Sequence, residues 1–92
     1  MSLEFNWDSR KAASNRKKHG VDFAEARTVF SDPYHGTLED KAHSFGEIRF
    51  VTVGRSAFGR ILVVAHTEDD EAIRIISARV ATKAEAQGYE ER

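Results

Sequence analysis

The side chains that could carry chemistry in this chain are a histidine and several arginines within apolar stretches. His66 directly follows the aliphatic run of residues 61–65. An imidazole with an ordinary pKa near ~6.5 can act as a general acid or base at neutral pH. A histidine on an apolar strand can also be a hydrogen-bonded core residue. Both interpretations of His66 stay open at the level of sequence.

Arginines interrupt the apolar run of residues 72–80, at Arg74 and Arg79. Arginine is rare in such a strand unless it is paired or lies in a groove. A guanidinium group holds phosphate through two parallel hydrogen bonds and stabilises charge that develops on it. The alternative is an ion pair with one of the 15 acidic residues. Tyr89, further along, could stack on a base or move a proton, or it could anchor the core.

The most basic segment lies near the amino terminus and includes Lys17 and Lys18. Its positive groups could contact phosphates, which requires charge and gives no sequence specificity. They could equally form the solvated face of a helix. The net charge of −1 excludes a uniformly basic nucleic-acid binder. Residues 49–67 nevertheless contain three arginines and no acid, so contact with a nucleic acid would be local.

Metal and thiol chemistry are not expected. The chain has no cysteine, and its four histidines, at 19, 35, 43 and 66, lack the spacing of metal ligands. No cofactor-binding fingerprint is present. The longest apolar run has five residues, at 61–65, far short of the ~20 needed to cross a membrane. We therefore expect a cytoplasmic protein, and a length of 92 residues predicts a single domain over 1–92.

Helices are predicted at both ends of the chain. Asp8 or Ser9 can cap a helix that ends near His19, with Gly20 in the position typical of a C-terminal glycine. Asp22 and Glu25 have capping-box spacing, which predicts a second helix from about residue 23 to before Pro33. A fuller capping box at residues 82–85 opens a C-terminal helix.

Strands are predicted in between, in β-branched runs at residues 47–53, 60–67 and 72–79, with a short edge strand at 36–40. The expected fold is α+β, with two N-terminal helices, an antiparallel meander of three to four strands and a C-terminal helix. Both faces of the last two long strands are largely apolar. Helices are therefore expected to cover part of each face.

The register of the last hairpin decides which polar groups meet. A tight turn at residues 69–70 would pair Glu68 with Glu71, and therefore Arg60 with Arg79. His66, Ser77 and Arg79 would then share one face. Two polar clusters are expected about 20 Å apart along the strands. One contains Arg55, Arg60 and Arg79, and the other contains His66, Glu68 and Arg74.

The sequence resembles the BrnT family, toxins of type II toxin–antitoxin modules. The resemblance extends in order over nearly the whole chain. It is carried by Phe5-Asn6-Trp7-Asp8, Lys18-His19-Gly20-Val21-Asp22-Phe23, Glu47-Ile48-Arg49-Phe50, Gly54-Arg55-Ser56, Gly59-Arg60-Ile61-Leu62-Val63-Val64, His66-Thr67-Glu68 and Arg74-Ile75-Ile76-Ser77-Ala78-Arg79, with Glu85 and Tyr89.

This resemblance implies a fold similar to RelE toxins and a metal-independent endoribonuclease that blocks translation by cutting RNA. It implies a neighbouring BrnA-type antitoxin that binds DNA and holds the toxin inactive in a hetero-oligomer, so that DNA is contacted only through the antitoxin. For such RNA cleavage, which needs a base, an acid and positive charge at the phosphate, we expect catalytic roles for His66, Glu68 (orienting His66), Arg55, Arg79 and Tyr89. If a single cluster is active, the Arg55 and Arg79 end with Tyr89 is preferred. RNA contacts are expected from Lys17, Lys18, Arg49 and Arg74.

A different class of function remains open on the sequence. The modest charge and the separated clusters also suit a non-catalytic interaction module that contributes to a DNA-bound repressor through its partner.

Overall fold

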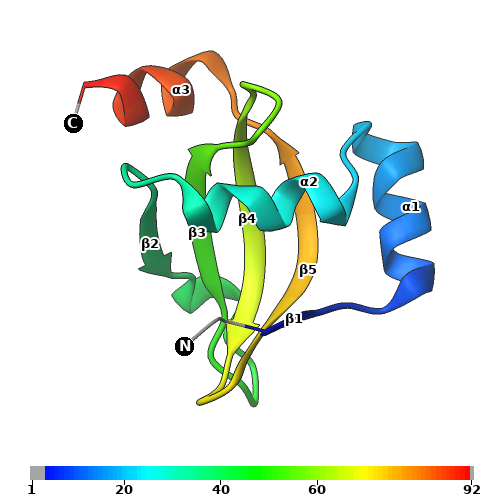
Figure 1. Ribbon diagram of the computed structural model, residues 1–92. Coiled ribbons are helices and arrows are strands. Elements are labelled where there is room, and N and C mark those ends of the chain that lie inside the picture. Colours follow the sequence, from blue (N-terminus) through cyan, green and yellow to red (C-terminus); the bar gives the residue numbers. More distant parts are fainter. Residues whose placement is uncertain (1–3, 92) are drawn as a thin grey trace.

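The computed structural model describes residues 4–91 and shows one sheet with helices on one face and at its ends (Figure 1). The elements follow one another as β1 (Glu4–Asn6), α1 (Ser9–His19), α2 (Phe23–Thr28), the 3-10 turn η1 (Val29–Ser31), β2 (Gly36–Glu39), the 3-10 turn η2 (Lys41–His43), β3 (Phe50–Arg55), β4 (Ile61–Glu68), β5 (Ala72–Val80) and α3 (Lys83–Glu90).

Local capping signals set most helix ends as predicted. The Asp8 side chain accepts hydrogen bonds from the first backbone N–H groups of α1, and Gly20 ends that helix with a φ of 69°. Thr82 and Glu85 form the predicted capping box of α3. The capping box predicted at Asp22 is wrong, because the Asp22 side chain makes no capping hydrogen bond. Glu25 forms an ion pair with a different element instead.

The sheet has five strands in the order β1-β5-β4-β3-β2 and is mixed. The meander of β2 to β5 is antiparallel, as predicted, and the short edge strand falls at β2. The parallel strand β1 beside β5 was not predicted. Three residues carry too little local signal to predict a strand. β1 forms because it pairs with the edge of β5, whose residues lie 68 positions later in the chain.

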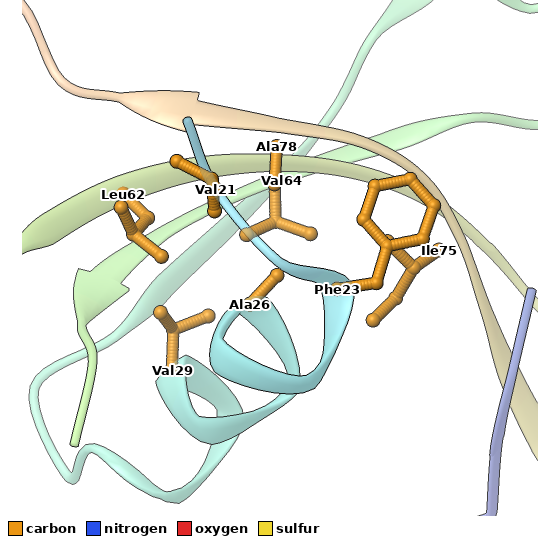
Figure 2. Packing of buried hydrophobic residues seen from close by; sticks show 8 residues of the cluster. All are labelled: Val21, Phe23, Ala26, Val29, Leu62, Val64, Ile75 and Ala78. Atoms are coloured by element: carbon orange, nitrogen blue, oxygen red, sulfur yellow. The ribbon is translucent and has the colours of Figure 1, made fainter. Parts of the chain in front are cut away.

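The main core lies between α2 and the sheet, and Figure 1 shows α2 lying across one face of the sheet. Phe23, Ala26 and Val29 point from α2 and η1 onto β4 and β5, and Figure 2 shows these side chains packed together. The complete cluster of buried residues is Val21, Phe23, Ala26, Val29, Leu62, Val64, Ile75 and Ala78. Phe30 packs against this cluster as well, so one side of α2 and η1 faces the core.

The predicted register of the last hairpin is wrong. Glu68 pairs with Ile73 rather than Glu71, and a β-bulge lies in β5 opposite Ala65 and His66, so that Ile76 is the extra residue. Arg79 pairs with Val63 rather than Arg60. The bulge reverses the alternation, so Ser77 and Arg79 lie on the face opposite His66 and the α2 core.

Asn15 fixes the bulged part of β5. Strand β1 ends opposite Arg74, so the outer edge of β5 has no strand neighbour beyond that residue. The buried Asn15 amide takes its place, accepting from Ala78 N at 3.0 Å and donating to Ala78 O at 2.8 Å and to Val21 O at 3.0 Å. One side chain of α1 therefore satisfies backbone groups that water cannot reach.

Candidate active site

The bulge turns the second half of β5 toward a groove on the sheet face opposite α2. The floor is made by apolar residues of β3, β4 and β5, and basic residues stand at its sides. The prediction that helices cover part of both faces of the sheet holds for the face covered by α2. The opposite face carries a groove with a volume of about 370 Å³. It is lined by His19, Asp40, His43, Arg49, Val51, Val63, Ala65, Ile76, Ser77, Ala78 and Arg79.

Arg79 is held in the groove by the first turn of α3. Its two Nη atoms donate to the two carboxylate oxygens of Glu85 at 2.7 and 2.9 Å, and Nη1 also lies 3.5 Å from Val80 O. The hydrogen bonds raise the pKa of Arg79 and hold the pKa of Glu85 down at about 2. A guanidinium has five N–H donors, so two remain for a ligand. The Arg79 side chain is 41% exposed.

Arg49 stands on the other side of the floor, where the segment of residues 40–49 closes on itself. Asp40 N donates to Arg49 O at 2.7 Å, and the Ser44 hydroxyl donates to Asp40 O and accepts from Arg49 N. Within this closed segment, His43 Nδ1 lies 2.8 Å from Asp40 Oδ2. The segment therefore presents a cation and a carboxylate–imidazole pair to the same groove.

Arg55 and Tyr89 meet in a separate hollow of about 570 Å³, lined also by Tyr34 and Glu90. The Arg55 guanidinium carbon lies 5.8 Å from the centre of the Tyr89 ring. Tyr89 is 8% exposed and its hydroxyl donates to Asp32 Oδ2. Burial and this hydrogen bond raise the pKa of Tyr89. The predicted association of Arg55 with Tyr89 is present, whereas Arg79 belongs to the groove.

The register of the sheet gives the distance between Arg55 in the hollow and Arg79 in the groove. Val53, Val63 and Arg79 form one row across three strands, and Arg55 lies two residues beyond Val53 on the same face. With a strand spacing of about 4.8 Å and a rise of about 3.3 Å per residue, the Cα atoms of Arg55 and Arg79 are about 12 Å apart. The hollow and the groove are thus neighbours on one face.

His66 lies in the core, on the opposite side of the sheet. It is 0% exposed and packs between the rings of Phe30 and Phe50, with ring centres 5.0 and 5.8 Å away. Its Nε2 shares a hydrogen bond of 2.7 Å with Thr52 Oγ1. Burial lowers the pKa of His66 to about 4. The catalytic role predicted for His66 stays a prediction, and in this arrangement the ring has no surface to offer RNA.

The remaining predicted residues lie apart from the groove. Glu68 Oε1 is 3.6 Å from His66 Nδ1 at the far end of β4. Lys17 and Lys18 are exposed on α1, and Arg74 is exposed on β5. Their predicted roles stay predictions. Arg60 leaves its predicted cluster because Glu25, 5% exposed, accepts hydrogen bonds from its guanidinium at 2.5 and 2.9 Å.

Sequence reasoning missed the groove residues Asp40 and His43. It weighed His43 only as a metal ligand, and the spacing of the histidines argued against that. His19, which also lines the groove, belongs to the basic N-terminal segment for which phosphate contact was considered. The usable signal was the spacing of Asp40 and His43, three residues apart, which one turn of a 3-10 helix brings together.

Residues 4–91 contain no group of three or more His, Cys, Asp or Glu side chains that could hold a metal ion. Over the same range, no helix combines the length and apolar character needed to span a membrane.

Comparison with known proteins places the chain in a family. The family model described as "Ribonuclease toxin, BrnT, of type II toxin-antitoxin system" matches residues 7–85. The crystal structure of the ribonuclease toxin BrnT of Brucella abortus, at 1.1 Å resolution, is similar at a TM-score of 0.69 and 27% identity, covering 89% of this chain and 100% of that one. No curated protein sequence matches. The chain belongs to the BrnT family of ribonuclease toxins of type II toxin–antitoxin systems.

Proposed function

We propose that this toxin cuts RNA without a metal ion, and that the groove is where the RNA backbone binds. The observation that carries the proposal is the pair of arginines, Arg49 and Arg79, on either side of an apolar floor. Arg49 lies four residues before Val53, which shares a row with Arg79, so the Cα atoms of the two arginines are about 16 Å apart along the groove. Guanidinium groups held in place beforehand stabilise the charge that develops on a phosphate during cleavage.

The arginines supply what a metal-free reaction needs at the phosphate. Such a reaction requires positive charge on the non-bridging oxygens, a base for the 2′-OH and a proton for the departing 5′-oxygen. Glu85 positions the Arg79 fork, and Arg49 is positioned by its backbone bonds to Asp40 and Ser44. The Arg79 guanidinium therefore needs little reorganisation when a phosphate arrives, whereas Arg49 is fixed through its backbone and its Nη2 lies 3.9 Å from Glu47 Oε1.

Arg55 and Tyr89 enter this proposal as a neighbouring contact for the same strand of RNA. The Cα atom of Arg55 lies about 12 Å from that of Arg79 on the same face of the sheet, so one extended strand of RNA can reach both arginines. The ring of Tyr34 is 70% exposed beside them. An exposed aromatic ring near a guanidinium is suited to stack on an unpaired base.

The direct experiment incubates the purified wild-type chain with single-stranded RNA in excess EDTA and follows cleavage on a denaturing gel. We expect cleavage that EDTA leaves unchanged. Loss of cleavage with EDTA, restored by a divalent cation, would remove metal independence from the proposal. Intact RNA under both conditions would favour the alternative of a non-catalytic interaction module.

We also propose that the antitoxin of this toxin is of the BrnA type, that the two form a hetero-oligomer in the cytoplasm, and that DNA is bound only through the antitoxin. The family membership supports an antitoxin partner. Expression of the toxin alone is expected to stop growth, and co-expression of the antitoxin encoded beside it is expected to restore growth. Gel filtration of the co-expressed pair would measure the stoichiometry.

A further inference from the structure

The groove contains an imidazole with the features of a general base. His43 Nδ1 and Asp40 Oδ2 are 2.8 Å apart, a charge-assisted hydrogen-bond distance. The His43 side chain is 67% exposed, whereas Asp40 is 25% exposed. The carboxylate is thus partly withdrawn from water while the ring reaches outward. Both residues line the groove that contains the two arginines.

The hydrogen bond decides which ring nitrogen can accept a proton. When the imidazole is neutral, a carboxylate at Nδ1 favours the tautomer with the hydrogen on Nδ1, which leaves the Nε2 lone pair unprotonated. The same carboxylate stabilises the imidazolium that forms after Nε2 takes a proton. Asp40 is therefore placed to orient His43 and to support its charge.

The backbone of the segment holds this pair beside Arg49. Asp40 N donates to Arg49 O at 2.7 Å, and His43 N donates to Asp40 O at 3.2 Å. The Ser44 hydroxyl joins both ends of the segment through hydrogen bonds of 2.7 and 3.0 Å. These four hydrogen bonds fix the backbone positions of His43 and Arg49 relative to each other, so both side chains start from the same side of the groove.

We propose that His43 is the general base of RNA cleavage in the groove and that Asp40 is its positioning residue. This inference rests on the proposed function. Nε2 of His43 takes the proton of the 2′-OH, O2′ forms a bond to phosphorus, and the bond from phosphorus to O5′ breaks. The 5′-oxygen takes a proton from solvent water, and the hydroxide that this leaves takes the proton from Nε2 of His43. The products are a 2′,3′-cyclic phosphate and a 5′-OH end, and Arg49 and Arg79 bind the non-bridging oxygens.

The test compares His43→Ala with His35→Ala, which replaces an exposed histidine outside the groove. We expect His43→Ala to cut about 100-fold or more slowly and His35→Ala to cut at the wild-type rate. Added imidazole is expected to restore part of the lost rate in His43→Ala. Circular dichroism and thermal unfolding check that both variants fold. We expect His43→Ala to fold, because the His43 side chain is 67% exposed.

Two further measurements separate a base from other roles. Asp40→Asn is expected to lower kcat about tenfold with little change in KM, because it disturbs the orientation of the base rather than RNA binding. RNA with a bridging 5′-sulfur at the mapped cut site has a leaving group that needs no acid. His43→Ala should therefore cut this substrate slowly as well. Cleavage of this substrate by His43→Ala at the wild-type rate would overturn the assignment of His43 as the base.

The outcomes also distinguish this inference from the function on which it rests. Wild-type protein that leaves RNA intact overturns the proposed function and this inference together. Wild-type protein that cuts RNA while His43→Ala cuts as fast overturns only the inference. Wild-type products with a 3′-OH and a 5′-phosphate would overturn it as well, because the 2′-OH would then not be the nucleophile.

Discussion

Acidification should destabilise this protein through His66, and the size of the effect follows from its burial. The ring has no exposed surface, and its pKa is lowered to about 4 from an ordinary value of 6.5. In the unfolded chain the ring is in water and regains the ordinary value. Between these two pKa values, the unfolded state binds a proton that the folded state does not.

The sign of the effect follows from that difference. Because the unfolded state binds more protons, the free energy of unfolding falls as the pH falls from about 6.5 to about 4. A pKa difference of about 2.5, at about 1.36 kcal/mol per pH unit, corresponds to a total loss of about 3 kcal/mol. Between pH 7 and pH 5 the same relation gives a loss of about 2 kcal/mol.

The assay is urea unfolding followed by circular dichroism at pH 7, 6 and 5, with His66→Gln as the matched variant. Glutamine does not titrate and can keep a hydrogen bond to Thr52. We expect wild type to lose about 2 kcal/mol more than the variant between pH 7 and pH 5. The range ends at pH 5 because carboxyl groups such as Glu25, whose pKa is lowered mainly by the hydrogen bond from Arg60, titrate below it. Parallel loss in the two proteins would refute the reasoning.

Three further changes test how the fold positions the groove. Asn15→Ala should cost about 3–5 kcal/mol in urea unfolding, because three buried backbone groups lose their partner, and a cost below 1 kcal/mol would contradict this role. Gly54→Ala should lower the Tm by several degrees, corresponding to about 1–3 kcal/mol, because a Cβ there would lie 3.1 Å from Val29 O; an unchanged Tm would argue against this close packing. Thr82→Ala should cost about 1 kcal/mol and Thr82→Ser much less, and equal losses in urea unfolding would exclude capping as the cause.

Elements with local signals could be predicted from the sequence. Asp8 and Gly20 bound α1, and Thr82 and Glu85 open α3, because each of these contacts joins residues a few positions apart. The strands of the meander follow from their β-branched runs for the same reason. The family resemblance added the function class, which composition and spacing could not supply.

The groove could not be predicted, because it depends on contacts between distant residues. The bulge in β5 moves Ser77 and Arg79 to the other face, and it is held by Asn15, 63 positions before Ala78. The alternation of apolar residues in β5 fits either register, since both faces of this strand are largely apolar. The unpaired residue Ile76 therefore decides that Arg79 lies on the groove face of the sheet.

The ion pairs were equally beyond the sequence. Arg60 contributes to folding through Glu25, 35 positions away, rather than to a cluster of arginines.

His66 could have been a base or a core residue by its residue type alone. Its packing between two aromatic rings, contributed by η1 and β3, was visible only once the chain was folded.

The most direct test of the central claim, that the groove is where RNA is cut, is the cleavage rate of Arg79→Ala relative to Arg27→Ala in EDTA. Arg27 is an exposed arginine of α2, and it lies against the Phe5 ring. We expect Arg79→Ala to cut about 100-fold more slowly than wild type, because a preorganised donor to the phosphate is lost, and Arg27→Ala to match wild type. Equal rates for the two variants would contradict a catalytic groove.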